Sequence, residues 1–139
     1  MAAYNKFQDF AEQVLRGVHN FGSHTFKAVL TNTAPSAANT VLADIAQVAA
    51  TGGYAAGGYV LDTVVLVETA GTAKVTIADE VITAAGGSVG PFRYAVVYNA
   101  TSAGGPLVCF YDYGSSITLA DTENFTLDFD GSAGVFTLT

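Results

Sequence analysis

The chain has 139 residues, a formal net charge of −7 and a sequence pI near 4.3. Its length predicts a single domain, and its acidic balance argues against a nucleic-acid partner, because binding to a phosphate backbone needs clustered Lys and Arg. Charged residues make up 12% of the chain, about half the share in an average domain. We therefore expect part of the surface to be buried against a partner or another copy. The alternative is that the content of Ala, Gly and Thr alone explains the high hydropathy.

Cysteine usage and the N-terminal residues indicate a cytosolic product. Cys109 is the single cysteine, so no internal disulfide can form. The N-terminus lacks the basic, apolar and small-residue order of a signal peptide. No apolar run reaches the roughly 18 residues of a membrane span. We therefore expect a protein that is made in the cytosol and does not enter a membrane.

Residues 5–18 are expected to form the one substantial helix, within an N-terminal helical arm of residues 1–22. Phe7, Phe10 and Val14 recur with the three-and-four spacing of one helix face. Glycines beyond the pattern supply the stop. Such a helix is marginal alone, so its apolar stripe should pack either on the β-body of the same chain or on a neighbouring subunit.

The remainder, residues 23–139, is predicted to be one β-domain. The expected strands are residues 25–30, 60–69, 72–79, 81–83, 92–99, 107–112, 117–119, 125–130 and 135–138. The second and third should form a hairpin across Ala70-Gly71. Residues 36–58 are expected to be a long loop with one helical turn, and loops of this length are usually functional or ordered by a partner. The strand spacing predicts an all-β fold, an antiparallel β-sandwich with jelly-roll-like topology.

The motifs predict no catalytic, cofactor or metal site. Residues 86–90 fit the pattern G-x-S-x-G, but a strand pattern follows where a nucleophile elbow needs a helix, so Ser88 is expected in a glycine-rich loop. His19 and His24 lie five residues apart, which misses the one-turn spacing of paired metal ligands, and we expect them at the surface near the helix end. Residues 128–131 lack most ligands of a calcium loop. The sequence therefore predicts a protein that is not an enzyme.

Six runs in chain order resemble small virion structural proteins of tailed bacteriophages. They are KAVLTNT, GYAAGG, RYAVVYNAT, PLV, DYGSS and FTLDF, at residues 27–33, 53–58, 93–101, 106–108, 112–116 and 125–129. The resemblance implies a non-enzymatic β-sandwich that is made in the cytoplasm of a bacterial host and decorates the surface of a phage head. It also implies that the protein cements neighbouring major capsid subunits as a homodimer or homotrimer, without cofactor.

Three groups of residues are candidates for the interface: apolar anchors in the helix, aromatic residues in the long loop, and acids in the last third of the chain. They are Phe7, Phe10, Val14, Tyr54, Tyr59, Asp121, Glu123, Asp128 and Asp130. The alternative is that the helix closes the core and the acids face water. Alternative functions are a minor tail or head-tail connector protein, a host-surface or carbohydrate-binding virion module, and a small hydrolase that uses Ser88.

Overall fold

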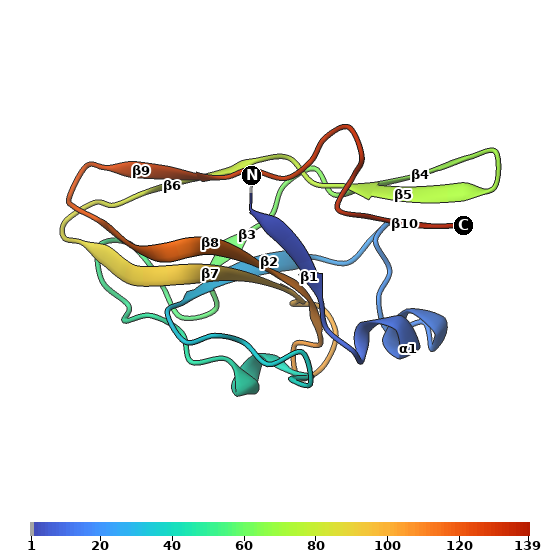
Figure 1. Ribbon diagram of the computed structural model, residues 1–139, viewed down its shortest axis with the longest axis horizontal. Helices are drawn as coiled ribbons and strands as arrows, with labels where there is room; N and C mark the ends of the chain where they lie inside the picture. The colour runs from blue at the N-terminus through green and yellow to red at the C-terminus, as the bar shows by residue number, and fades with distance from the viewer. Residues whose placement is uncertain (1) are drawn as a thin grey trace.

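Three antiparallel sheets account for most of the chain in the computed structural model, which describes residues 2–139 (Figure 1). They have the strand orders β1-β8-β7-β2-β3, β10-β5-β4 and β6-β9. The strands are β1 (Ala3–Lys6), β2 (Phe26–Thr31), β3 (Tyr59–Val60), β4 (Val65–Thr69), β5 (Thr72–Thr76), β6 (Glu80–Thr83), β7 (Val89–Asn99), β8 (Leu107–Leu119), β9 (Asn124–Leu127) and β10 (Phe136–Leu138), with one α-helix, α1 (Phe10–Leu15), and one 3-10 turn, η1 (Leu42–Asp44). The prediction of a mostly β chain with antiparallel sheets is confirmed.

The sheets lie in two layers (Figure 1). β6 and β9 lie over one face of the five-stranded sheet, and β4, β5 and β10 extend this layer past the end of the large sheet. Aromatic rings join the layers: the ring centroids of Phe92 and Phe125 are 5.4 Å apart, and those of Tyr111 and Phe129 are 5.6 Å apart. This interlayer core is the larger of the two apolar clusters.

β8 is one strand of 13 residues where the sequence predicted two. The residues between the predicted strands, 113–116, lie at a shift in register, because the pairs with β7 stop at Asp112 and resume at Ile117. β7 itself begins at Val89 rather than at residue 92. Val89 lies opposite Leu119 and Phe92 opposite Ile117, with shifts in register between these pairs and the rest of the ladder. Pairing with β7 on both sides of this irregular stretch therefore holds β8 together as one strand.

The N-terminal segment differs from the predicted helix of residues 5–18. Residues 3–6 form β1, which pairs with β8, and the helix spans only Phe10–Leu15. The backbone N–H and C=O groups on this edge of β8 pair with β1. A helix that started at residue 5 would leave these groups without a partner strand. Phe7 and Phe10 are 0% and 4% exposed, so these two predicted interface anchors pack on the β-body of their own chain.

The long segment of residues 32–58 packs on both clusters: Leu42 and Ile45 cover the second face of the large sheet, whereas Val48 and Tyr54 join the interlayer core. Val29 and Val96 point to the second face and form a separate apolar cluster with Phe7 and Ile45. Ile45, next to η1, is 8% exposed. The long segment, expected to be functional or ordered by a partner, therefore helps to close the core of the same chain.

Gly58 marks the closest approach of this segment to β2. A Cβ atom at Gly58 would lie 1.9 Å from the carbonyl oxygen of Ala28, and the φ of Gly58 is +77°. Gly114 is a matched control, because its φ is +87° and a Cβ atom there would meet open space. We predict that Gly58→Ala lowers the free energy of unfolding by more than about 3 kcal/mol, and Gly114→Ala by about 1–2 kcal/mol, in urea titrations. Equal losses in the two variants would contradict this account of the contact.

Candidate docking surface

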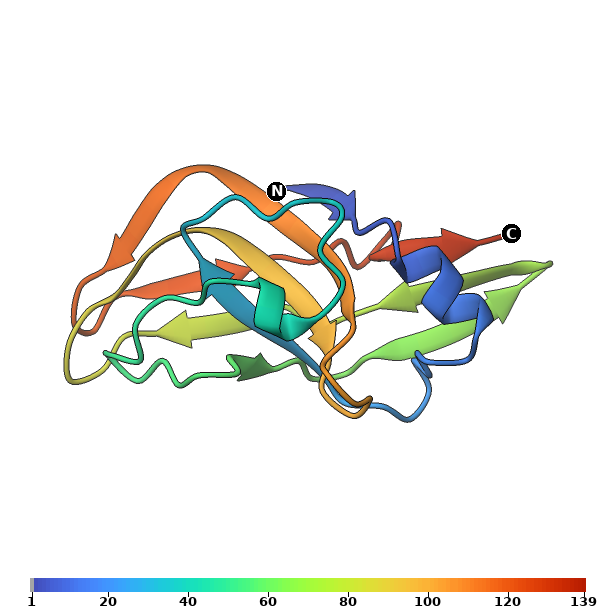
Figure 2. The same cartoon turned by 90° about the horizontal axis from the view of Figure 1, so that it is seen from below.

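The sheet β10-β5-β4, here called the wing, projects from the body of the molecule (Figures 1 and 2). Its tip is the predicted turn Ala70-Gly71, with φ of 50° and 87°. Two positive φ values are what a type I′ hairpin turn requires. The N–H of Gly71 donates to a carboxylate oxygen of Glu68 at 2.6 Å. The predicted hairpin is confirmed by the pairing of β4 with β5.

The wing has an apolar inner face and a threonine-rich outer face. Cross-strand neighbours share a face, so the register puts two rows on the inner face: Leu66, Val75 and Phe136, then Glu68, Ala73 and Leu138. The outer face carries Val65, Val67, Thr69, Thr72, Lys74, Thr76 and Thr137. The inner face packs toward α1 and the residues after it, since the ring of Phe136 lies 5.1 Å from that of Phe10 and 5.0 Å from that of Phe21.

An apolar groove, here called the wing groove, runs between α1 and the inner face of the wing. It consists of two hollows of about 350 and 300 Å³ that share Val14, Phe136 and Leu138 as walls. Val14, the third predicted helix anchor, is thus a residue of the groove. Leu66 and Leu15 line its two ends.

Three leucines of the groove are unusually accessible to water. Leu15 is 85% exposed, Leu138 57% and Leu66 48%. A contiguous group of exposed large apolar side chains is typical of an interaction surface. Each leucine belongs to an element with a visible apolar pattern, but the sequence does not show that the wing leaves them uncovered. Sequence reasoning therefore missed all three.

The charges around the groove cancel. β1, the wing strands, and α1 with its two cap residues carry three bases and three acids: Lys6, Arg16, Lys74, Asp9, Glu12 and Glu68. The net charge of −7 therefore belongs to the rest of the chain. Because burying uncompensated charge is costly, this neutral region is the part of the surface that another protein can cover at the smallest electrostatic penalty.

A polar cluster fixes the segment between α1 and β2. The side-chain nitrogen of Asn99 lies 3.2 Å from Nδ1 of His19 and 3.0 Å from Nδ1 of His24. It also lies 3.3 Å from the carbonyl oxygen of Val18. The two histidines expected at the surface are thus brought together around one buried asparagine, and His19 is itself 7% exposed.

His19 packs among aromatic rings at the base of the groove. Its ring centroid lies 5.3 Å from that of Phe10 and 5.9 Å from that of Phe21. Within residues 2–139, Nε2 of His19 has no hydrogen-bond partner. Burial, together with the nearby His24, lowers the pKa of His19 to about 4, and Asp9 opposes this shift. His19 is therefore a neutral, structural residue at physiological pH.

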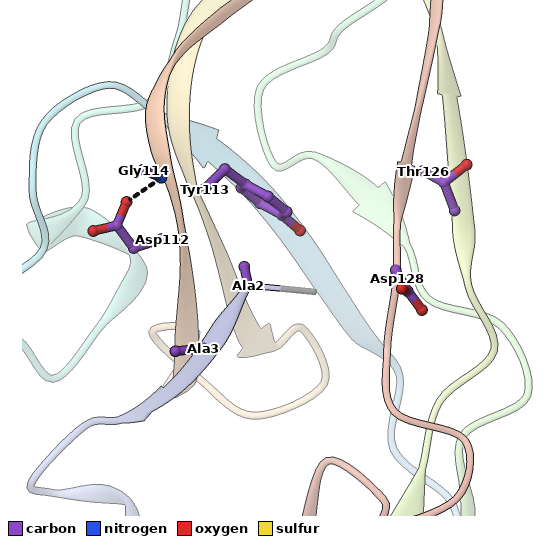
Figure 3. A pocket seen from close by; sticks show the side chains of 7 residues that line it. All are labelled: Ala2, Ala3, Asp112, Tyr113, Gly114, Thr126 and Asp128. Atoms are coloured by element: carbon purple, nitrogen blue, oxygen red, sulfur yellow. Dashed lines mark hydrogen bonds between the residues drawn. The ribbon is translucent and has the colours of Figure 1, made fainter.

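A second, polar hollow of about 450 Å³ opens between β8 and the segment that follows β9 (Figure 3). The ring of Tyr113 points toward it, whereas the side chains of Asp112, Thr126 and Asp128 point away. Asp112 is held on the other side by Arg93, whose Nε and terminal nitrogen lie 2.8 and 3.0 Å from its oxygens. Burial, with the nearby Asp128, raises the pKa of Tyr113 to about 12. The hollow thus offers one neutral phenol, and Thr126 and Asp128 lie at its rim.

The two tyrosines predicted as loop anchors lie away from the wing groove. Tyr54 is 2% exposed. Its hydroxyl donates to Oε1 of Gln47 at 2.8 Å and accepts the N–H of Leu30 at 3.3 Å. Tyr59 packs against Tyr54 at a centroid distance of 5.6 Å. Both rings therefore serve the packing of the long segment onto β2.

Three of the four predicted acids order turns of the chain. Each accepts backbone N–H groups, a common use of Asp and Glu in turns. The pairs are Asp121 with Gly86 at 2.9 Å, Glu123 with Ala120 at 2.8 Å, and Asp130 with Ser132 and Ala133 at 2.9 and 2.7 Å. Asp128 lines the polar hollow. None of the four lines the wing groove.

Ser88 lies in the loop before β7, where its carbonyl oxygen accepts the hydroxyl of Thr51 at 2.9 Å, and the predicted strand follows it. Across residues 2–139, no three His, Cys, Asp or Glu side chains are grouped so that they could hold a metal ion. Over the same range, none of the helices has both the length and the hydropathy of a membrane span.

Comparison with known proteins adds no relative. No protein-family model, no curated protein and no solved structure matches the chain. The resemblance to phage virion proteins therefore stays a prediction, and the wing groove is the feature on which a functional proposal rests.

The lowered pKa of His19 predicts a specific loss of stability in acid. The unfolded chain has the ordinary histidine pKa of 6.5 and the folded chain one of about 4, so the unfolded state binds a proton first as pH falls. The contribution of neutral His19 is complete above pH 6.5 and is lost toward pH 4, by up to about 3 kcal/mol. Urea titrations should show a shallower decline for His19→Phe over this window than for the wild type.

His24→Gln is the matched control for that measurement. It removes the second histidine of the cluster but leaves His19 buried, so most of the pH dependence should persist. If His19→Phe and the wild type lose the same free energy of unfolding between these pH values, His19 is not the group responsible.

Proposed function

We propose that the chain is a non-enzymatic structural protein of a phage virion, which docks on the outside of the head and stabilises contacts between major capsid subunits. The observation that carries this proposal is the group of exposed leucines, Leu15, Leu66 and Leu138, around a neutral groove on an acidic chain. The resemblance to small virion proteins supplies the class of partner. The proposal includes a jelly-roll-like sandwich, built from the two layers, as the body that carries the groove.

Burial of the leucines is the driving force that we assign to docking. Covering a fully exposed leucine is worth about 1.5–3 kcal/mol, and association costs at least about 4 kcal/mol in lost freedom of motion. Three partly exposed leucines therefore give a modest affinity for one site. A protein that binds the assembled shell, and not its free subunits, still stabilises that shell by mass action.

The groove and the acidic remainder favour a particular kind of partner surface. The two hollows suit apolar side chains from a loop or strand end of a capsid subunit. The acidic regions outside the groove suit basic side chains around that apolar contact, because complementary charge steers association and fixes orientation. A shell presents the same site many times, which matches a small protein with one docking surface.

The direct test uses particles of the phage that encodes this chain, assembled without it. Purified chain is added to these particles, and bound protein is measured by co-sedimentation. We predict that Leu138→Glu abolishes most of the binding, because it places a charge in the groove. Val81→Glu is the matched control: Val81 is 56% exposed, close to the 57% of Leu138, but lies on β6. Circular dichroism should show both variants folded.

The outcomes separate the groove from the wider proposal. Equal loss of binding in the two variants would reject the groove as the docking surface. Quantitative mass spectrometry of intact virions should find hundreds of copies per particle for a shell protein. A dozen or fewer copies, lost together with the tails, would instead support the minor tail or head-tail connector alternative. Absence from virions would overturn the proposal.

The polar hollow favours one second candidate, a module that binds host-surface carbohydrate. Sugar recognition combines an aromatic ring with hydrogen-bonding groups; Tyr113 supplies the ring, and Thr126 and Asp128 line the rim of the same hollow. On this reading, Thr126→Ala removes binding on a glycan array while the fold is kept. Thr83→Ala, a matched change on β6 opposite β9, should leave it intact. An array without signal for the wild type would reject this candidate.

A further inference from the structure

The free edge of β4 stands out among the strand edges of this molecule. β4 is an outer strand of the wing and has five residues, whereas the other edge strands have two to four. All five of its residues are exposed, and three are Val65, Leu66 and Val67. β4 contains neither lysine nor proline, two common devices that protect an edge from pairing, and Glu68 is its one charged residue. By contrast, the edge strand β1 ends in Lys6 and β3 has two residues.

The backbone of β4 is ready to accept another strand. In a two-residue hairpin the residues that flank the turn form a hydrogen-bonded pair, and alternate residues point their backbone groups the other way. Leu66 and Glu68 therefore turn N–H and C=O groups toward the free edge. Outside the β4-β5 ladder, no backbone hydrogen bond joins either residue to another part of the described chain.

We propose that two copies of this chain associate through β4, by antiparallel pairing about a two-fold axis that puts Leu66 opposite Leu66 of the second copy. The two wings then form one continuous six-stranded sheet. This inference concerns the edge of the wing and does not depend on the function proposed for its groove.

The sequence of β4 is self-complementary in this register. Leu66 meets Leu66, Val65 meets Val67 of the second copy, and Glu68 meets Val64. The two Glu68 side chains are then separated by four positions, roughly 13 Å along the strands. A register centred on Val67 would instead put Leu66 against Glu68, so matching of apolar side chains favours the register centred on Leu66.

Charge also favours a second copy at this edge. Two chains that each carry a net charge of −7 repel one another over most of their surfaces. The wing strands contribute one acid and one base, Glu68 and Lys74, so two copies can meet there without added repulsion. A pairing of about five residues buries a small area, and the dimer is accordingly expected to dissociate on dilution.

The first test is analytical ultracentrifugation of the full chain across a concentration series. We expect a reversible monomer–dimer equilibrium. The double variant Val65→Glu/Val67→Glu should be monomeric, because it brings four glutamates together on the outer face while leaving the groove unchanged. The control Val60→Glu/Val81→Glu adds the same charge at positions that are 50% and 56% exposed, and it should dimerise like the wild type.

The second test reads the register with cysteines. Paired residues of antiparallel strands have Cα atoms about 4.5–5.5 Å apart, within the range of a disulfide. Leu66→Cys should therefore give a covalent dimer under mild oxidation, while Val67→Cys, at a similar exposure of 50% against 48%, should react far more slowly. The natural Cys109 is buried and does not compete.

Each result decides the proposal. A wild type that stays monomeric at every concentration, or a trimer, overturns pairing through β4. Faster cross-linking of Val67→Cys overturns the register. A control double variant that fails to dimerise would show that the interface is not specific to β4. A wild type that binds shells but does not dimerise would reject this inference alone, whereas a wild type that dimerises but does not bind shells would reject only the docking function.

Discussion

Both faces of the β7-β8 hairpin carry apolar side chains, and covering both faces is the constraint on which the rest of the structure depends. On one face, Ala95 and Val97 belong to the interlayer core; on the other, Val96 belongs to the second cluster. The layer of β6 and β9 covers the first face, and Leu42 and Ile45 of the long segment cover the second. The N-terminal residues contribute to this covering as well, since Phe7 packs in the second cluster and β1 pairs with the edge of β8.

The wing lies outside the region in which both faces of the large sheet are covered. It continues the upper layer beyond the large sheet, so only α1 and the residues after it are available to face its inner side (Figures 1 and 2). Phe136 and Val75 are covered, but α1 is too short to cover Leu66 and Leu138. The apolar groove and the unprotected edge of β4 thus have one origin, a small sheet that extends past its own core.

Local patterns predicted most of the strands but missed β1, and they made the N-terminal helix too long. The Ala70-Gly71 hairpin follows from turn chemistry within a few residues, and it appears as expected. The helix was placed over residues 5–18 because Phe7, Phe10 and Val14 have helical spacing, yet residues 3–6 pair with a strand that lies a hundred residues further along the chain. The spacing of apolar residues along a short segment does not show that a strand far along the chain will pair with it. The same limit explains Tyr54, whose hydroxyl serves Leu30 and Gln47 inside the fold rather than a partner outside it.

The sequence by itself determined the antiparallel β class, the hairpin of the wing and the acidic balance of the chain, since these depend on alternation, turn residues and composition. Tertiary structure alone decided that Leu15, Leu66 and Leu138 share one groove, that His19 is buried, and that β4 has a free edge. These features depend on which faces the other elements reach to cover. That outcome is set by packing between segments far apart in the chain, which no local pattern records.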